Sequence, residues 1–403
     1  MEYFIKVVGL IVEYNPFHNG HLYHLENSKK NTKADYTIAI MSGSFTQSGN
    51  IAIYDKFTRA KLAIENGVDL VLELPTIYSN SSANYFAFGA INILDRLNII
   101  DSICFGSECD NITLLENIAK TLLHFDDKIN DEIKSINSNG MSYVKSRDKI
   151  LRSFLTADEL ECIKSPNNIL GIEYIKNIYL LNSKITPYLI KRKDSDFNDI
   201  LLSKNTNFTS ATSIRNCIRE NKLDVIKKYV PASCFNVISS TSPLFNEKLF
   251  EILKYIIISS SKDKIKNIFE VNEGLENKIL KEINTSNSYD EYVQNIKSKR
   301  YSLVKIKRML NNIILNITKD DFNYAYTNKI GYAHILACSK RGKKLLPEIS
   351  KNSDIELITS INNKILSSFK HDIVKYLNFD IFSSNIHSIL TKSNINKDYT
   401  NKL

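Results

Sequence analysis

Short apolar runs alternate with stretches of helical periodicity over the first two hundred residues of the chain. The apolar runs are rich in β-branched residues, and we predict strands over residues 4–12, 36–41, 70–74, 99–105 and 186–190. Apolar positions at helical spacing predict helices over residues 56–66, 82–97, 111–125 and 168–181. This alternation predicts an α/β fold with a doubly wound, mainly parallel sheet.

The pattern changes between about residues 220 and 243, where Pro231 and a serine-rich run ending at Pro243 interrupt it. Beyond this break the chain reads as mainly helical. A chain of 403 residues exceeds what one hydrophobic core usually serves. We therefore expect two domains, residues 1–225 and residues 226–403, of which the second is mainly helical.

The most informative stretch joins the first strand to a helix. An apolar run ends at Asn15-Pro16, because proline cannot donate a hydrogen bond to a sheet, and Asn19-Gly20 opens a helix. His18 then precedes the helix N-terminus and His21 lies in its first turn. Free backbone N–H groups and the positive end of the helix dipole suit this turn to polyphosphate. The alternative is that the two histidines cap the helix or bind a structural anion.

Other polar residues follow the remaining predicted strands. The run 42–44 (Ser-Gly-Ser) follows the second strand, the run 106–108 (Gly-Ser-Glu) the fourth, and Arg192 the fifth. Ligands of doubly wound sheets bind at the carboxyl ends of the strands, so these residues and the histidines are expected to form one site. Each segment taken alone could equally be an ordinary turn, and Arg192 a solvated charge.

The composition is that of an ordinary globular protein, with 43% apolar and 24% charged residues. A formal net charge of +9 favours a polyanionic partner, although such a charge can also serve only solubility. No apolar stretch is long enough for a membrane span and no signal-peptide pattern is present, so we expect a cytoplasmic protein without membrane partners. The six cysteines show no metal-binding spacing, and we predict reduced thiols and no metal site.

A basic segment lies in the second half of the chain. Residues 297–308 hold six basic and no acidic side chains, and residues 339–344 hold four more basic ones. Helical spacing would place Arg300, Lys307 and Arg308 on one face. Together with Lys299 they are candidate RNA contacts, although charge runs are often only solvated surface.

Residues 9–24, GLIVEYNPFHNGHLYH, resemble the N-terminal signature of the bacterial tRNA(Met) cytidine acetate ligases, which belong to the H-x-G-H nucleotidyltransferase superfamily. The resemblance continues in the same order through residues 41–47, 55–60, 69–75, 105–108 and 166–171. It implies a Rossmann-like nucleotidyltransferase sheet in residues 1–225, which would bind ATP and carry catalysis. It also implies that the second domain, residues 226–403, which is mainly helical and basic, binds tRNA.

The reaction implied by the resemblance is an ATP-dependent ligation. Acetate would be activated as acetyl-adenylate, and the N4 amine of the wobble cytidine of elongator tRNA(Met) would then be acetylated, with release of AMP and pyrophosphate. Mg²⁺ is expected to accompany ATP, although no acidic cluster in the sequence fixes it. The oligomeric state is left open.

The resemblance assigns catalysis to His18 and His21. The expected ATP contacts are Ile11, Val12, Glu13, Tyr14, Asn15, Pro16, Phe17, His18, Asn19, Gly20, His21, Leu22, Gly106, Asn167, Asn168 and Arg192. The resemblance does not decide which of the two asparagines meets ATP, and either could be only a helix cap. A second phosphate-binding element is expected at Thr212, Ser213 and Arg215, for which a helix cap is the alternative.

One departure from the family pattern is Ser48, which stands where these ligases usually carry arginine, so the contact made by that arginine is in doubt. Three other functions remain open. A small-molecule adenylyltransferase would share the H-x-G-H core but usually has about half this length. A catalytically silent nucleotide-binding protein would bind ATP without pyrophosphate exchange, and a general RNA-binding scaffold would bind RNA without ATP.

Overall fold

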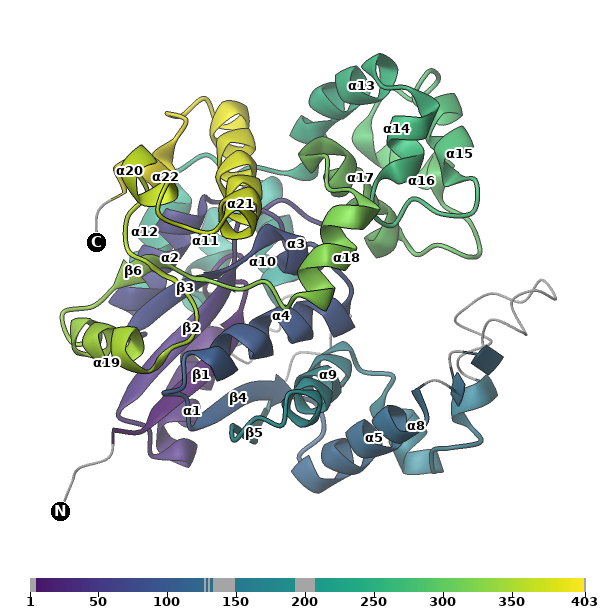
Figure 1. Cartoon of the computed structure of the whole chain (residues 1–403). Coiled ribbons are helices and arrows are strands. Elements are labelled where there is room, and N and C mark those ends of the chain that lie inside the picture. Colours follow the sequence, from purple (N-terminus) through teal and green to yellow (C-terminus); the bar gives the residue numbers. More distant parts are fainter. Residues whose placement is uncertain (1–4, 127, 130, 133–148, 193–206, 402–403) are drawn as a thin grey trace.

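The computed structural model describes residues 5–126, 128–129, 131–132, 149–192 and 207–401. Seven strands form one sheet in the order β5-β4-β1-β2-β3-β6-β7 (Figure 1). The strands are β1 (Val7–Val12), β2 (Tyr36–Ser42), β3 (Leu70–Leu74), β4 (Ser102–Ser107), β5 (Thr186–Lys191), β6 (Ala333–Cys338) and β7 (Leu357–Ile358). All five predicted strands are present, and the first five strands run parallel as expected.

The strand order changes direction at β1. This strand pairs with β2 on one side and with β4 on the other, with Val8 opposite both Thr37 and Ser102. A crevice therefore forms at the carboxyl ends of β1 and β4, which is where doubly wound sheets bind their ligands.

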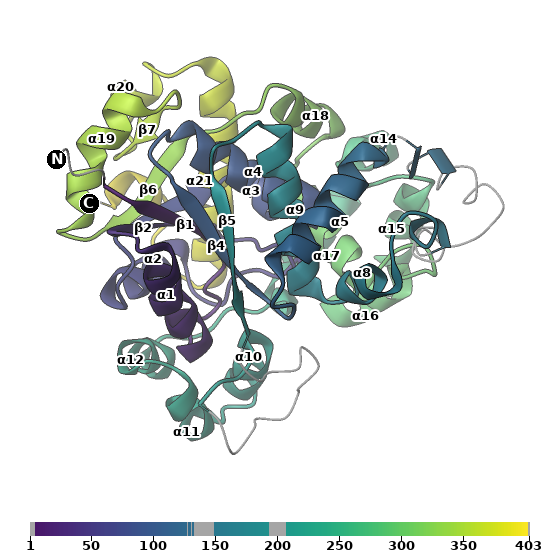
Figure 2. The same ribbon diagram turned by 90° about the horizontal axis from the view of Figure 1, so that it is seen from below.

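Helices cover both faces of the sheet (Figure 2). The alternation of side chains along β1 shows this directly, because Val7 joins one apolar cluster whereas Val8 and Leu10 join another. The first cluster contains α4 (Ala83–Arg96), α5 (Ile112–His124) and α9 (Pro166–Leu180). The second contains α1 (Asn19–Thr32), α2 (Lys56–Glu65), α10 (Ala211–Arg219) and α12 (Ala232–Ser240). The doubly wound architecture is thus confirmed.

Local signals set the helix ends. The Asp55 carboxylate accepts hydrogen bonds from the N–H groups of Phe57 and Thr58 and caps α2, while Gly67 follows its end at a φ of +103°. Asn111 caps α5 in the same manner. Ser82 is the N-cap residue of α4, but its side chain makes no capping hydrogen bond.

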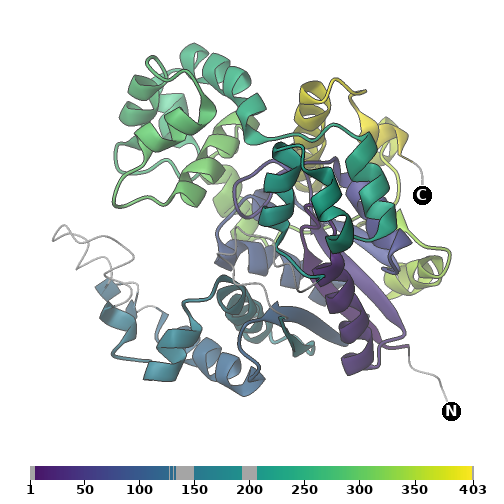
Figure 3. The same ribbon diagram turned by 180° about the vertical axis from the view of Figure 1, so that it is seen from behind.

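The chain from residue 250 to residue 327 forms a helical lobe beside the sheet (Figures 1 and 3). Its helices are α13 (Phe250–Ser259), α14 (Lys262–Asn267), α15 (Leu275–Glu282), α16 (Tyr289–Ile296), α17 (Leu303–Leu315) and α18 (Lys319–Thr327). The remaining helices are α3 (Thr76–Ser79), α8 (Ala157–Cys162), α11 (Leu223–Ile226), α19 (Leu345–Asn352), α20 (Asn363–Leu366), α21 (His371–Leu390) and α22 (Lys397–Thr400), with 3₁₀ turns at Lys227–Tyr229, Asn246–Leu249 and Gly342–Lys344.

After α18 the chain returns to the sheet. β6 pairs antiparallel with β3, with Cys338 opposite Leu70, and β7 extends the edge. Neither strand was predicted from the sequence. The sheet therefore includes residues from both parts of the chain, and the division at residue 225 stays a prediction. Within the described residues, no helix combines the length and apolar character that a bilayer span requires.

Candidate active site

A pocket of about 350 Å³ opens at the carboxyl ends of β1, β4 and β5, between the N-termini of α1, α9 and α10. Its wall includes the predicted residues Ile11, Val12, Glu13, Tyr14, Asn15, His18, Gly20, His21, Gly106, Asn167, Arg192, Thr212 and Arg215. Residues from five separate segments of the sequence thus meet in one cavity, whereas the predicted run 42–44 and residues 107 and 108 are not part of its wall.

Backbone N–H groups at the N-terminus of α1 orient the rings of the two histidines. Nδ1 of His18 accepts a hydrogen bond from the N–H of Gly20 (3.0 Å), and Nδ1 of His21 accepts one from the N–H of His18 (3.3 Å). Because both Nδ1 atoms act as acceptors, a neutral ring must carry its proton on Nε2. Among the described residues neither Nε2 has a partner, so each ring presents an N–H donor for a ligand.

Burial keeps both rings neutral. It lowers the pKa of His18 to about 3, with further contributions from Arg192 and Arg215, and it lowers the pKa of His21 well below its ordinary value. Both side chains were predicted to stabilise phosphate charge. Their surroundings favour a pair of neutral donors beside the positive end of α1.

Arg192 and Gly106 lie together where β5 and β4 end. A Cβ atom on residue 106 would lie 3.5 Å from Cγ of Arg192, an ordinary van der Waals contact, so the two residues are neighbours in the wall. Nε of Arg192 lies 3.8 Å from Oε1 of Glu108, which also accepts a hydrogen bond from the Asn167 amide (2.5 Å). The guanidinium is thereby positioned toward the pocket with a charge suited to phosphate.

The two neighbouring asparagines at the start of α9 have different surroundings. Asn168 is 3% exposed, and its Oδ1 accepts from Ser107 Oγ (2.7 Å) and from the N–H of Glu108 (2.9 Å). Its amide donates to the carbonyl of Cys162 (2.9 Å). Asn168 therefore fixes the loop after β4, whereas Asn167 lines the pocket. The geometry favours Asn167 as the ligand contact.

The N-terminus of α10 forms another part of the wall. Ser210 caps this helix by accepting from the N–H of Ser213 (3.1 Å). Arg215 donates to the carbonyl of Asn15 (2.8 Å) and to Thr212 Oγ1 (2.9 Å), so it joins α10 to the turn after β1. Arg215, near the N-terminus of α10, thus lines the same pocket as the histidine pair.

Six residues predicted as ligand contacts lie outside the pocket wall: Pro16, Phe17, Asn19, Leu22, Asn168 and Ser213. Phe17 is 1% exposed and belongs to the apolar core. The amide of Asn19 donates to the carbonyls of Asn207 (3.0 Å) and Lys228 (2.9 Å). Leu22 packs against the same core, and Ser213 is buried behind the α10 cap.

The wall also includes Thr209, Ser210 and Ala211, which belong to the predicted second phosphate-binding segment 209–215. It further includes residues that were not predicted: Tyr23, His24, Gln47, Ser48, Phe86, Phe105, Pro166, Leu170, Tyr174, Ile190, Lys191 and Phe208. His24 and Gln47 fall within the segments that carry the family resemblance, so a signal for them existed. Phe86 and Tyr174 gave none, because apolar residues at helical spacing predict core. Ser48 Oγ bonds Thr46 Oγ1 (3.0 Å) and the Asn50 amide (2.9 Å).

The structure corrects how the predicted RNA contacts are arranged. Arg300 precedes α17 and pairs with Glu273 (3.3 Å), so it does not share a helix face with Lys307 and Arg308. Arg308 is 7% exposed because the inner face of α17 packs on the loop of residues 46–50. Lys307 Nζ contacts Asn50 Oδ1 (3.3 Å), and Lys299 is exposed.

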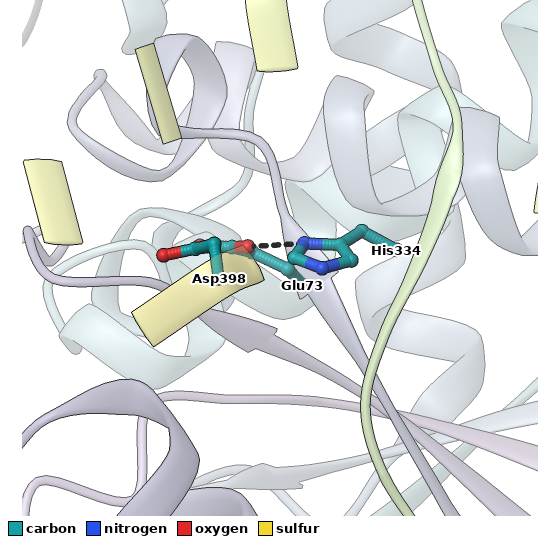
Figure 4. Close-up of side chains that lie close together, drawn as sticks. All are labelled: Glu73, His334 and Asp398. Atoms are coloured by element: carbon teal, nitrogen blue, oxygen red, sulfur yellow. Dashed lines mark hydrogen bonds and ion pairs between the residues drawn. The ribbon is translucent and has the colours of Figure 1, made fainter. Parts of the chain in front are cut away.

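A second cluster of polar groups lies in the core, away from this pocket. Glu73 of β3, His334 of β6 and Asp398 of α22 each offer one ligand atom, and these atoms lie within 4.8 Å of one another (Figure 4). The Lys56 ammonium, however, lies 2.7 Å from Glu73 and 2.6 Å from Asp398. Although burial raises the pKa of Glu73, the Lys56 charge and a hydrogen bond with His334 hold it at about 2.

This buried lysine supplies the positive charge that the carboxylates require. We therefore assign no metal to the cluster. Its ion pairs and hydrogen bond join α2, β3, β6 and α22. The expectation that the chain has no resident metal stays a prediction.

The HIGH Nucleotidyl Transferase family model matches residues 5–402. The tRNA(Met) cytidine acetate ligase of Clostridium perfringens is 40% identical over 404 residues, covering 98% of each chain. That of a Thermoanaerobacter species is 39% identical over 395 residues and 96% of each chain.

Two crystal structures of Thermotoga maritima TmcAL are similar across the whole fold. The apo form superposes with a TM-score of 0.91 at 31% identity, covering 96% of both chains. The form bound with alpha-thio ATP gives a TM-score of 0.89 at 30% identity, covering 96% of this chain and 95% of the other. The match of fold, length and sequence together shows that this chain belongs to the HIGH Nucleotidyl Transferase family and, within it, to the tRNA(Met) cytidine acetate ligases.

Proposed function

We propose that this protein uses ATP and acetate to acetylate the N4 amine of the wobble cytidine of elongator tRNA(Met). The observation that carries the proposal is the pair of neutral imidazoles, His18 and His21, in a pocket that Arg192 and Arg215 also line. Nearly full-length similarity to tRNA(Met) cytidine acetate ligases supports the reaction, and the neighbour bound with alpha-thio ATP supports the nucleotide.

The first step would join acetate to AMP. A carboxylate oxygen of acetate attacks the α-phosphorus of ATP, the bond to the β-phosphate oxygen breaks, and pyrophosphate leaves. Acetate is otherwise too weak an electrophile to acylate an aromatic amine. The Nε2–H groups of His18 and His21 would donate to the phosphates as charge develops, and the guanidiniums would hold the leaving group.

Mg²⁺ would enter with the polyphosphate. Among the described residues of the pocket wall Glu13 is the single carboxylate, and its Oε1 already accepts from the N–H of Gln47 (2.9 Å). Mg²⁺ commonly binds nucleotides through phosphate oxygens and water with few protein ligands. It would supply charge neutralisation of the phosphates.

The acceptor tRNA would approach across the helical lobe. Lys299 is exposed there, and Lys307 lies at the loop of residues 46–50, whose Gln47 and Ser48 line the pocket. We propose that exposed cations on this side hold the RNA phosphates. Because its substrate is a tRNA used in translation, we place the protein in the cytoplasm.

The decisive experiment is exchange of labelled pyrophosphate into ATP by the purified protein with Mg²⁺ and without tRNA, in the presence and absence of acetate. We expect exchange that requires acetate, followed by acetylation of tRNA(Met) when the RNA is added. Exchange that requires a different small acid would replace acetate in the proposal. Absence of exchange both with and without tRNA(Met) would refute it.

A further inference from the structure

Glu13 is the carboxylate that the pocket presents to a ligand. It follows β1, and its backbone carbonyl is held by the guanidinium of Arg59 (2.6 Å). The side chain Oε1 accepts from the N–H of Gln47 (2.9 Å). In the part of the chain that the structure describes, Oε2 has no hydrogen-bond donor, so one oxygen of a well-positioned carboxylate is available to a ligand.

The pocket wall that includes Glu13 also includes two aromatic side chains, Phe86 (3% exposed) and Tyr174 (4% exposed). Tyr174 of α9 lies close enough that the Glu13 charge, after burial, raises the pKa of its phenol. Phe86 of α4 lines the same cavity. Aromatic side chains provide flat surfaces on which an unstacked base can lie, and a carboxylate is the standard acceptor for the exocyclic amine of cytosine.

We propose that Glu13 recognises the target cytidine by accepting a hydrogen bond from its N4 amine and takes the proton that this amine loses during acetyl transfer. The inference rests on the function proposed above and adds the residue that selects the base. Uracil carries a carbonyl oxygen at this position, which the carboxylate would repel.

The step balances without a further reactant. N4 of cytidine attacks the carbonyl carbon of acetyl-adenylate, and a new C–N bond forms. The C–O bond to the phosphate breaks, and AMP leaves with that electron pair. The N4 proton passes to Oε2 of Glu13 and then to solvent. Burial raises the pKa of Glu13, which makes its carboxylate a better proton acceptor than an exposed one.

Three other roles compete with this one: contacting ATP, as the family resemblance implies, binding Mg²⁺, and holding the loop that contains Gln47. All three would act on the adenylation step at least as strongly as on acetyl transfer. The two half-reactions therefore separate these roles from base recognition. Glu13→Gln is the informative variant, because its amide oxygen can still accept from Gln47 while its NH₂ group opposes the cytidine amine and cannot take a proton.

The experiment compares wild type, Glu13→Gln, Glu13→Asp and the control Glu26→Gln, which changes an exposed residue of α1. Acetate-dependent pyrophosphate exchange measures adenylation. Single-turnover acetylation of a tRNA(Met) anticodon stem-loop measures transfer, with a stem-loop carrying uridine at the wobble position as the inactive substrate control. We expect Glu13→Gln to lower the ratio of transfer to exchange on the order of a hundredfold. Glu13→Asp should lower it less, and Glu26→Gln should leave it unchanged.

A pH profile adds a readout that a structural role would not move. In wild type the transfer rate should fall as pH drops through the raised pKa of Glu13, and Glu13→Gln should lose this dependence. Arg59 and Arg215, which face the carboxylate, stay charged over this range, and burial keeps Tyr174 neutral. An unchanged ratio, or exchange that falls as much as transfer, would overturn the assignment. Lack of exchange in wild type would instead refute the proposed function itself.

Discussion

The rings of His18 and His21 lie with their centroids 3.8 Å apart and their planes at 32°. Each Nδ1 accepts a backbone N–H of the same turn, so the orientation of each ring is fixed and each Nε2 is left for a ligand. In the proposed mechanism the pair would act as two uncharged donors whose orientation is already fixed by the backbone. Such preorganised donors are worth about 2.7–4 kcal/mol each in transition-state stabilisation.

His21→Ala should therefore reduce acetate-dependent pyrophosphate exchange on the order of a hundredfold or more. The donor is lost at the reacting phosphate, and the N–H of His18 loses its acceptor. His124→Ala, which changes an exposed residue at the end of α5, is the matched control and should exchange like wild type. Normal exchange by His21→Ala would remove this residue from the mechanism.

Acid should destabilise the protein partly through His387 of α21. Its Nε2–H donates to the carbonyl of Ala52 (3.0 Å), and burial lowers its pKa to about 4 although Asp55 acts in the opposite direction. The unfolded chain holds a proton on this residue below about pH 6.5, whereas the folded chain does not until about pH 4. The free energy of unfolding therefore falls as pH decreases from 6.5 to 4, by up to about 1.4 kcal/mol per pH unit for this residue.

His387→Gln keeps an N–H donor but cannot titrate, so it should flatten that slope. The measurement is urea unfolding at several pH values between 5 and 7, with His371→Gln, an exposed position at the start of the same helix, as the control. An equal slope in His387→Gln and wild type would contradict this explanation.

The buried Lys56 should be essential for stability. Its ammonium joins Glu73 and Asp398, and all three side chains are inaccessible to solvent. Lys56→Met would leave two buried carboxylates without a counter-charge, which typically costs about 3–5 kcal/mol. Urea unfolding should show this loss, whereas Lys61→Met, an exposed change on the same helix, should not.

The loss should be recovered in large part when Glu73→Gln and Asp398→Asn are added to Lys56→Met, because the uncompensated charges then disappear. Destabilisation of the triple variant by as much as the single one would show that packing, not charge, is the contribution of Lys56.

The parts of this structure that the sequence predicted depend on local signals. An apolar run, Pro16 and Gly20 specify β1, the turn and the start of α1 within fifteen residues. The parallel strands likewise have apolar runs of their own. Strand β6 was missed although Ala333–Cys338 is itself a short apolar run. In a mainly helical stretch such a run cannot be told from a helix segment until its pairing with β3, more than 260 positions away, is known.

Within the site, residue type predicted which side chains are polar or charged, but not which of them face the pocket and which are buried behind its wall. Asn167 and Asn168 are equivalent in sequence, yet one lines the pocket and the other is fully engaged behind it. Tyr174 was not predicted because an aromatic residue at helical spacing reads as core in the absence of a tertiary structure. The helix α9 was predicted, but the sequence did not show which of its side chains face the pocket.

Arg308 and Lys299 should respond differently to mutation, although both belong to the same basic segment. The Arg308 guanidinium donates to the carbonyl of Gln47 (3.2 Å) and to Glu270 (3.4 Å), and burial raises the pKa of Glu270 while the Arg308 charge lowers it. Arg308→Ala would leave this carboxylate buried and unpaired, so urea unfolding should show a loss of about 3 kcal/mol or more. Adding Glu270→Gln should restore most of it.

Lys299→Ala should leave unfolding unchanged, because this side chain is exposed. If it contacts an RNA phosphate, the variant should bind tRNA(Met) more weakly, and the slope of log affinity against log salt should decrease by about 1. Filter binding at several salt concentrations measures this slope, with Lys61→Ala on α2 as the control for a general change in charge. If Lys299→Ala and the control bind alike, the RNA must approach the pocket along a different face of the helical lobe.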